Sequence, residues 1–483
     1  MSDAVLAIDA GTTNVLALII GSDGRVLGRT VGRYSLHYPE PGLVEQDPEE
    51  LWATIMTAVK RSLSEAGLSA GDLSAIGITG QRGTIIIWER KSGQTLGPAI
   101  SWQDQRGTEK AKELAAQGFI TVNSITPASK MEHALDLLPG SHERMRKGEL
   151  AWGNVDSFIA WRLSSGTVHA TDCSNACTTG YFDYFTEWKW MAKLLEVQGL
   201  DPSLFPKIVD TSEIIGLTSC QAFGAEIPIG SIIGDQQSAA YAQGCLKPGE
   251  GKVTFGTSAT INVNTGREIK ITAGTYPLVL WRRSQDTAYC LEGMVITAGA
   301  VFDWLVRLGV LESVSAAAEA AASVPDTHGV FFLPALQGLG SPHSLPERHG
   351  VFEGLTLGAS ASHLVRAAME GVAFRVREML DGVYEGSGLV QPEVLRVDGG
   401  GAANDVLMQI QANALGCPVE RMKPLEATAF GAALLAGEAC GVWEPWTTSS
   451  LRQADRIFEP QWSEDEREER FARWRQTCRL EAT

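Results

Sequence analysis

The sequence predicts an α/β protein made of two similarly built halves. Short apolar runs that end in glycine-containing turns alternate with helical segments, which is typical of an α/β sheet core. The chain opens with a strand, a Gly-Thr-Thr turn and a second strand at 5–20. The same pattern returns at 252–263, where Gly256 stands 245 residues after Gly11. A hairpin that recurs after about half the chain indicates two related halves, and 483 residues are too many for one core.

The first half continues from the hairpin into a helix. The stretch Asp47–Glu50 provides an N-cap, a first-turn proline and first-turn acids, so a helix is expected to run from here to about Gly67. Further strands are predicted at 75–79, 84–88 and 98–102, and further helices at 154–163, 188–197 and 238–244. The turn at 246–250 is the expected boundary between an N-terminal domain, residues 1–247, and a C-terminal domain, residues 248–483.

The second half repeats the alternation of strands and helices after its own hairpin. Strands are predicted at 330–333 and 394–397, and helices at 362–383, 403–415 and 427–440. Beyond Pro445 the chain is polar, and the heavily charged stretch 463–479 is predicted to be a solvated surface helix that caps the domain.

The charge balance argues against several classes of partner. With 40 basic and 57 acidic residues, the net charge of -17 repels nucleic acid and anionic lipid, so neither nucleic acid nor a membrane is an expected partner. The first residues lack the basic region of a signal peptide, and no apolar run approaches the roughly 20 residues that span a bilayer. Cys173 and Cys177 are more simply buried thiols than a metal site. These features predict a cytoplasmic protein.

Two Gly-Thr loops are candidates for phosphate binding. In the stretch Asp9–Thr13, glycine lets the backbone approach a ligand, the threonine hydroxyl and amide groups donate hydrogen bonds, and the carboxylate can hold hydrated magnesium. The alternative is a hairpin turn whose threonines bind their own backbone. The stretch Phe255–Ser258 repeats the loop, and two such loops on facing domains would hold a polyphosphate from both sides.

Two strand-to-helix turns suggest nucleotide binding and proton transfer. At 397–404 a strand runs into a glycine-rich turn and a helix, which directs backbone amides toward a nucleotide, although such turns also serve packing alone. The turn matches neither the GxGxxG motif nor the Walker motif. Asp235 ends an apolar strand beside two glutamines, where its carboxylate can accept a proton from a substrate hydroxyl. The alternative is an N-cap for the following helix.

Two further polar clusters follow predicted strands, at 80–84 and at 101–106. Trp102 stands among amide and acid side chains in the second cluster, a combination that suits a sugar or polyol, whose C–H faces pack on aromatic rings while its hydroxyls form hydrogen bonds. The alternative is a pair of ordinary loops at strand ends.

Together these stretches resemble the FGGY family of carbohydrate kinases, and the motifs are closest to those of glycerol kinases. The similar stretches are Ala7–Thr13, Leu43–Pro48, Gly77–Arg82, Ala99–Arg106, Gly234–Gly244, Thr254–Thr257, Gly338–Pro342, Arg396–Asn404 and Thr428–Gly437. The resemblance implies two actin-like, ribonuclease-H-like domains facing a cleft that binds ATP, Mg²⁺ and the acceptor. It implies ATP-dependent phosphorylation of a sugar or polyol hydroxyl, and it is compatible with a homodimer or homotetramer.

The resemblance also implies a role for individual residues. Asp235 is the implied catalytic base, and Asp9 and Asp235 are the implied metal ligands. The implied nucleotide contacts are Thr12, Thr13, Gly256, Thr257, Gly299, Asp303, Gly400 and Asn404. The implied acceptor contacts are Arg82, Gly83, Trp102, Asp235 and Gln236.

Four departures from the family pattern bear on the substrate and on catalysis. Gly83 stands where glycerol kinases carry glutamate, and Ile125 falls near their aromatic acceptor contact. Leu16 replaces a usual Arg or Lys, and residues 342–346 depart from a Pro-Tyr-Trp-Asp-Pro stretch. The small residue at 83 predicts a four- or five-carbon polyol or ketose rather than glycerol. The alternatives are a divergent glycerol kinase and a catalytically weak sugar-binding or regulatory protein.

Overall fold

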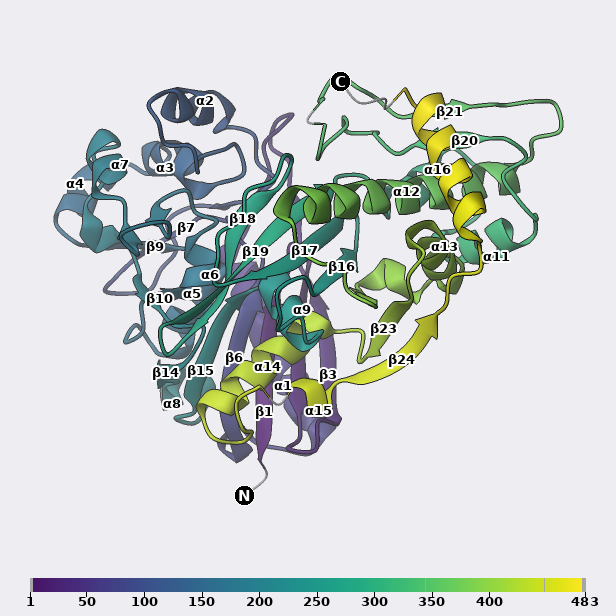
Figure 1. Cartoon of the computed structure of the whole chain (residues 1–483). Helices are drawn as coiled ribbons and strands as arrows, with labels where there is room; N and C mark the ends of the chain where they lie inside the picture. Colours follow the sequence, from purple (N-terminus) through teal and green to yellow (C-terminus); the bar gives the residue numbers. More distant parts are fainter. Residues whose placement is uncertain (1–2, 344, 447, 480–483) are drawn as a thin grey trace. The chain divides into compact units, whose positions relative to one another are not determined.

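The computed structural model describes residues 3–343, 345–446 and 448–479, and the chain forms two units (Figure 1). The first unit consists of the residues up to Ala242 with Leu278–Ala288 and Thr428–Leu451; the second consists of Gln243–Pro277, Tyr289–Ala427 and the residues from Arg452 on. The predicted boundary after residue 247 lies close to the end of the first segment. The prediction of two continuous domains differs from the structure, because two segments of the second half belong to the first unit.

The first unit is built on a six-stranded sheet in the order β14-β15-β6-β1-β2-β3. Its strands are β1 (Ala4–Ala10), β2 (Asn14–Ile20), β3 (Val26–Arg33), β6 (Leu73–Gly80), β14 (Ser212–Leu217) and β15 (Pro228–Gly234). Strand β6 runs parallel to β1 on one side and to β15 on the other, whereas the outer pairs are antiparallel. The carboxyl ends of β1, β6 and β15 therefore meet at one edge of the sheet.

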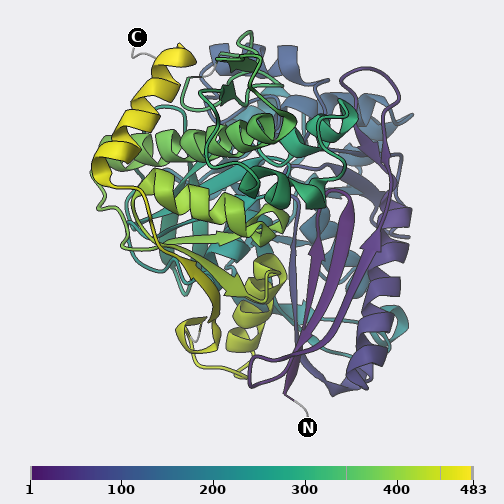
Figure 2. The same ribbon diagram turned by 90° about the vertical axis from the view of Figure 1, so that its right-hand side faces the viewer.

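Two helices pack closely on this sheet because glycines on the strands leave room for them. Helix α1 (Pro48–Ala66) lies along β2 and β3 (Figure 2), and its N-cap is Asp47 as predicted. Helix α14 (Ala427–Ala439) packs on β15, where a Cβ atom on Gly230 would lie 2.7 Å from the Ala436 carbonyl oxygen. The Ser231 hydroxyl also donates to the Ala432 carbonyl oxygen at 2.8 Å. These contacts explain why residues 428–451 belong to the first unit.

A second hydrophobic cluster of the first unit supports the loops that follow β6 and β8. Its elements are β7 (Ile86–Glu89), β8 (Ala99–Ile100), α2 (Thr108–Ala116), α3 (Pro127–Asp136), α4 (Ser141–Arg146), β9 (Leu150–Gly153) and α7 (Ala192–Val197). The predicted strand 98–102 is thus only two residues long. The predicted helix 188–197 starts later, because β12 (Lys189–Trp190) pairs with β11 (Phe182–Asp183).

The second unit contains most of a seven-stranded sheet in the order β18-β19-β17-β16-β22-β23-β24, from which the greater part of β18 is assigned to the first unit. Its strands are β16 (Gly251–Phe255), β17 (Ala259–Gly266), β18 (Tyr276–Arg283), β19 (Asp286–Val295), β22 (Leu395–Asp398), β23 (Val419–Lys423) and β24 (Gln453–Phe458). The main helices are α10 (Ala300–Arg307), α12 (Ala361–Ser387), α13 (Asp405–Leu415) and α16 (Glu464–Thr477). The second hairpin, β16–β17, pairs antiparallel like β1–β2, and β22 runs parallel to β16.

The C-terminal helix α16 corrects one expectation. It is charged on its surface, but Phe471 and Trp474 are buried in the core of the second unit. The Trp474 indole N–H donates to the Phe332 carbonyl oxygen at 2.9 Å. The helix is therefore an integral part of the core, because two aromatic residues one turn apart provide a narrow apolar face within a polar sequence.

Short elements connect this framework: β4 (Leu36–His37), β5 (Glu45–Gln46), α5 (Val155–Leu163), β10 (Ala170–Asp172), α6 (Cys173–Ala176), β13 (Lys207–Val209), α8 (Cys220–Phe223), α9 (Asp235–Ala242), α11 (Ala317–Ala322), β20 (Phe331–Leu333), β21 (Val351–Glu353) and α15 (Thr448–Leu451). Short 3₁₀ helices occupy Ala70–Asp72, Pro202–Leu204, Val314–Ala316 and Gly400–Ala403. Cys173 and Cys177 are buried free thiols. Among the described residues, no helix combines the length and apolarity needed to cross a bilayer.

Candidate active site

The polar residues predicted in the first half follow three neighbouring parallel strands. The loop 11–13 follows β1, residues 81–83 follow β6, and Asp235 follows β15. A Cβ atom on Gly80 would lie 2.5 Å from the Ala10 carbonyl oxygen, so β1 and β6 end in close contact. Because the three strands are parallel and adjacent, their functional residues gather at one edge of the sheet, as in other open α/β sheets.

Asp235 is the first residue of α9 and forms an ion pair at this edge. Its Oδ1 atom accepts a hydrogen bond from the Gln236 amide at 2.7 Å and lies 3.1 Å from Nε of Arg82. A Cβ atom on Gly234 would lie 2.8 Å from Cδ of Arg82, so glycine lets the arginine pass over the strand end. The Asp235 side chain is 28% exposed. Since both contacts use Oδ1, Oδ2 can accept a hydrogen bond from a ligand hydroxyl.

A buried network behind the strand end positions Asp235. The Gly234 amide donates to the Ser174 hydroxyl oxygen at 2.9 Å, and this hydroxyl donates to Asp172 at 2.9 Å. The Thr211 hydroxyl donates to the other oxygen of Asp172 at 2.7 Å. No sequence motif points to these residues. The only local signal is Asp172 at the start of a short helix, which suggests nothing more than an N-cap.

Asp9 is a second carboxylate at the same edge. Burial, and to a smaller extent the negative charge of Asp235, raise the pKa of Asp9 to about 7. Its cross-strand partner in β2 is Leu16, and opposed residues of an antiparallel pair share a face of the sheet. A leucine here provides no positive charge for Asp9, whereas the arginine or lysine usual in the family would.

The two carboxylates fit the requirements of Mg²⁺. The described residues contain no group of three or more histidine, cysteine, aspartate or glutamate side chains that could hold a metal. Mg²⁺ in phosphoryl-transfer sites needs only one or two carboxylates, because water and phosphate oxygens supply the remaining ligands. A divalent cation near Asp9 and Asp235 would also relieve the repulsion that raises the pKa of Asp9.

The Gly-Thr loop of the first unit is held by buried amide side chains. The Tyr34 hydroxyl donates to the Gly11 carbonyl oxygen at 2.5 Å, and the Gln46 side-chain amide donates to the Thr12 carbonyl oxygen at 2.8 Å. Gln81 joins them, because its side-chain amide donates to Tyr34 at 3.1 Å and to Gln46 at 2.9 Å. Gln81 is buried. It therefore supports the loop rather than the acceptor.

Trp102 connects the acceptor cluster to this loop. Its indole N–H donates to the Thr12 hydroxyl oxygen at 3.1 Å, which leaves the hydroxyl hydrogen of Thr12 able to donate to a phosphate. Thr13 is exposed, and its hydroxyl oxygen accepts from the Asn14 side chain at 3.3 Å. The polar cluster at 101–106 and the Gly-Thr loop at 11–13 are therefore parts of one hydrogen-bonded structure.

The structure corrects the expectation that Gly83 opens room for a larger substrate. Gly83 has a φ of +74°, a conformation that side-chain-bearing residues rarely adopt. A Cβ atom there would lie 3.1 Å from the Ile125 carbonyl oxygen and 3.4 Å from Cβ of Trp102. The space beside Gly83 is thus filled by the protein itself. A sequence shows that a side chain is absent, but only the fold shows what lies in its place.

Six of the eight predicted nucleotide residues lie in the second unit, whereas Thr12 and Thr13 lie in the first. Gly256 and Thr257 lie in the exposed turn of the hairpin β16–β17. The Gly299 amide donates to the Gly256 carbonyl oxygen at 3.0 Å, and a Cβ atom on Gly401 would lie 2.9 Å from Cβ of Phe255. The turn that contains Gly400 therefore packs beside the hairpin.

Two predicted nucleotide residues stand at helix starts of the second unit. Asp303 is exposed in the first turn of α10. Asn404 is the N-cap of α13, and its side-chain oxygen accepts from the Val406 and Leu407 amides, both at 3.1 Å. Gly400 has open space where a side chain would be. The residues predicted for the acceptor and the metal thus lie in the first unit together with Thr12 and Thr13, and the other six residues predicted for the nucleotide lie in the second.

Comparison with known proteins gives a consistent assignment. Residues 4–242 match the N-terminal domain of the FGGY family of carbohydrate kinases, and residues 251–440 match its C-terminal domain. The chain is 41% identical over 484 aligned residues to a glycerol kinase from Aromatoleum aromaticum, with 98% of this chain and 97% of that protein covered. It is 39% identical to a glycerol kinase from Dechloromonas aromatica, with 97% and 96% covered.

Solved structures support the same conclusion. A Plasmodium falciparum glycerol kinase with ADP matches 100% of this chain and 99% of its own length, with a TM-score of 0.91 and 27% identity. A Rhodospirillum rubrum xylulose kinase matches 99% and 98%, with a TM-score of 0.81 and 23% identity, which supports the fold alone. The two-domain kinase fold is therefore confirmed, and the chain belongs to the FGGY family of carbohydrate kinases, phosphotransferases with an alcohol group as acceptor.

Proposed function

We propose that this carbohydrate kinase transfers the γ-phosphoryl group of ATP to glycerol. The observation that carries the proposal is the full-length similarity, near 40% identity, to relatives that are glycerol kinases. The filled space beside Gly83 supports it, because the main argument for a longer polyol or ketose was room at that position. The conclusion replaces the four- or five-carbon acceptor expected from the sequence.

Asp235 acts as the general base in the proposed reaction. Its Oδ2 atom accepts the proton of a glycerol hydroxyl while that hydroxyl oxygen forms a bond to the γ-phosphorus. The bond between the γ-phosphorus and the bridging oxygen breaks, which gives glycerol phosphate and ADP. The ion pair between Arg82 and Oδ1 keeps the carboxylate oriented toward the acceptor. Without this contact the Asp235 carboxylate would rotate, and Oδ2 would no longer be within hydrogen-bond distance of the acceptor hydroxyl.

The phosphate loop and the metal share the charge of the transferring group. The hydroxyls of Thr12 and Thr13 donate to phosphate oxygens from the first unit, and Thr257 does so from the second. Asp9 and Asp235 would hold Mg²⁺, which would neutralise phosphate charge when bound. Trp102 provides an apolar wall for the carbon atoms of the acceptor, and Gln236 donates a hydrogen bond to one of its hydroxyls.

An ADP-release assay over a panel of acceptors tests the proposal. The panel contains glycerol, a four-carbon polyol, a five-carbon polyol and a five-carbon ketose, each measured as kcat/KM at saturating ATP and Mg²⁺. Glycerol is expected to be the best acceptor. A higher value for a four- or five-carbon compound would refute glycerol as the substrate, and binding of acceptors without turnover would favour a sugar-binding or regulatory protein.

The variant Asp235→Asn tests the mechanism with the same assay. Removing a general base reduces the rate by about 10²–10⁴, while ATP binding, which this side chain does not make directly, is expected to persist. Asp23→Asn is a matched control, because Asp23 is an exposed acid of the same unit. Turnover of Asp235→Asn within about threefold of the wild type would exclude Asp235 as the base.

A further inference from the structure

Lys130 is a fully buried lysine in the first turn of α3. Its side chain is 0% exposed, and its stem packs against Gly107, where a Cβ atom would lie 2.7 Å from Cγ of Lys130. Burying an ammonium group costs free energy unless it is hydrogen-bonded. A lysine placed in such a close-fitting position therefore needs a reason that an apolar residue would not meet.

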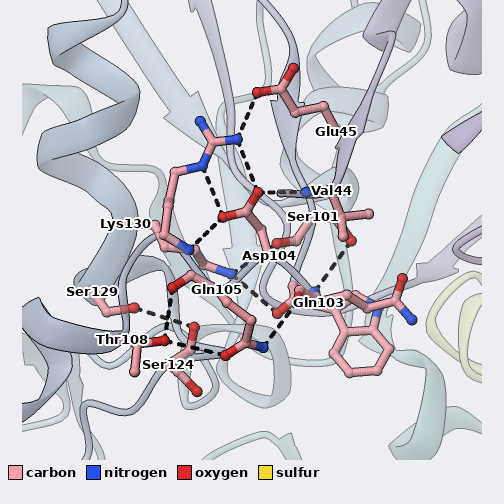
Figure 3. A network of polar contacts seen from close by, with 12 residues as sticks. Val44, Glu45, Ser101, Gln103, Asp104, Gln105, Thr108, Ser124, Ser129 and Lys130 are labelled. Atoms are coloured by element: carbon pink, nitrogen blue, oxygen red, sulfur yellow. Dashed lines mark hydrogen bonds and ion pairs between the residues drawn. The ribbon is translucent and has the colours of Figure 1, made fainter. Parts of the chain in front are cut away.

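The ammonium group of Lys130 donates hydrogen bonds to the main chain at Ser101 and Trp102. Its Nζ atom donates to the Ser101 carbonyl oxygen at 2.9 Å and to the Trp102 carbonyl oxygen at 3.2 Å. The Asp104 amide also donates to the Ser101 carbonyl oxygen at 3.1 Å. Figure 3 shows Lys130 approaching Ser101 and Asp104 from the helix side. Two successive carbonyls thus point at one buried cation.

The rest of the same loop is held by an ion-pair network. Asp104 accepts from the Val44 amide at 2.7 Å and from the Arg106 guanidinium at 2.8 and 2.9 Å (Figure 3). Arg106 also binds Glu45 at 2.6 Å. These contacts fix the loop after Trp102, whereas Lys130 fixes the peptide groups on both sides of the Trp102 side chain.

We propose that Lys130 is a positioning residue for acceptor binding: it holds the peptide groups flanking Trp102, so that the indole forms the acceptor wall and reaches Thr12. The inference rests on the proposed function, because it takes Trp102 as an acceptor contact. It extends that function by connecting a residue on α3, remote from the reacting atoms, to acceptor affinity. The indole contact with Thr12 also makes the loop a link between acceptor and phosphate sites.

The protonation of Lys130 provides a signature that packing alone would not produce. The pKa of Lys130 is lowered to about 7, chiefly by burial; the negative charge of Asp104 opposes this shift, and the positive charge of Arg106 adds to it. On the same helix as Lys130, the charged side chain of Glu132 is paired with Lys110 of α2 at 2.9 Å. As the pH rises through about 7, Lys130 loses its charge and one hydrogen-bond donor. Acceptor binding should weaken over that range.

The titration of Lys130 affects the stability of the fold in the opposite direction to acceptor binding as the pH rises. The folded pKa of Lys130 lies below the ordinary value of 10.5, so between these two values the unfolded chain binds more protons than the folded one. The free energy of unfolding therefore rises with pH over this range. A rise in acceptor KM with no loss of stability distinguishes positioning from general loosening of the fold.

The experiment compares Lys130→Met, Lys130→Arg and a control. Lys110→Met is the matched control, since it removes a lysine whose ion pairs are with Glu113 of α2 and Glu132 of α3 rather than with the Trp102 loop. Lys130→Met should raise KM for glycerol about tenfold and leave KM for ATP within about twofold. It should also abolish the increase of glycerol KM between about pH 6 and pH 9, whereas the wild type and the control retain it.

Lys130→Arg tests charge separately from shape. Arginine stays protonated, so this variant should show a glycerol KM that does not change over the same pH range. Unchanged glycerol KM in Lys130→Met would overturn the proposal, and so would equal effects on glycerol and ATP. If Lys130→Met fails to fold, the glycerol KM of the wild type and of Lys110→Met is measured as a function of pH instead. A glycerol KM that does not change with pH in the wild type would overturn the proposal.

A readout without substrate separates this inference from the proposed function. Hydrogen exchange of the amides at 101–106 should become faster in Lys130→Met than in Lys110→Met if Lys130 holds the loop. Should the wild type fail to phosphorylate glycerol, the proposed function fails while this measurement still decides the positioning role. Equal exchange in the two variants would overturn the role even in an active glycerol kinase.

Discussion

Replacing Asp9 by asparagine should remove most of the activity and, at the same time, stabilise the fold at neutral to alkaline pH. Asp9 lies in β1 opposite Leu16, with Asp235 as a neighbouring negative charge. Burial, followed by the charge of Asp235, raises its pKa from 3.8 to about 7. The ionised carboxylate is thus held in the folded protein at a cost, which a bound metal ion would offset.

The size of the effect follows from these two pKa values. Their difference corresponds to about 4 kcal/mol, and since Asp9 is partly accessible to solvent we expect roughly half of it, about 2 kcal/mol. The folded chain holds the proton of Asp9 more tightly than the unfolded chain. Its stabilising effect is therefore present below pH 3.8 and is lost as the pH rises to about 7. Asparagine, which is always neutral, avoids this loss.

Urea unfolding of Asp9→Asn and the wild type, without Mg²⁺, measures the effect. The variant should be more stable by about 2 kcal/mol near pH 8, and the advantage should shrink toward about pH 4. Asp23→Asn, an exposed acid of the same unit, should show no such trend. A stability difference that does not depend on pH would refute the reasoning, because the proton balance of Asp9 would then not be its cause.

Four further variants probe the site. Thr13→Val and Thr257→Val should each weaken ATP binding, and neither should change acceptor binding measured in the absence of nucleotide. Normal calorimetric ATP affinity in both variants would exclude the hypothesis that the two Gly-Thr loops hold the polyphosphate together. Ser174→Ala leaves the Gly234 amide without its acceptor and should lower kcat about tenfold at unchanged KM for ATP, whereas an unchanged kcat would exclude this support. Gly83→Ala should cost about 1–2 kcal/mol and raise KM for glycerol, because its φ of +74° disfavours a side chain; wild-type stability would contradict this.

The local chemistry of the site was readable from the sequence because it depends on neighbouring residues. An apolar run followed by Gly-Thr-Thr or Gly-Asp-Gln-Gln specifies a strand end with ligand-binding groups, whatever the rest of the fold. The cap at Asp47 and the start of α1 follow from the same local rules. The repeated hairpin likewise predicted two related halves, and two units with matching hairpins are observed.

The arrangement of these groups was decided by contacts between distant parts of the chain. The sequence alone suggests open space beside Gly83, yet a Cβ atom at this position would lie only 3.1 Å from the Ile125 carbonyl oxygen. In the sequence Lys130 is indistinguishable from an ordinary helix residue. It is buried only because the fold packs it against Gly107 and the Trp102 loop.

Composition and strand-end motifs thus indicate by themselves the kind of fold and the chemical groups that are available, and the resemblance of those motifs to known ones indicates the family. Tertiary structure alone decides which side chains meet, what fills the space beside a glycine and which ionisable groups are buried. The physical reason is that hydrogen-bonding capacity belongs to each residue, whereas burial, pKa and free volume arise from neighbours that the chain brings together only on folding.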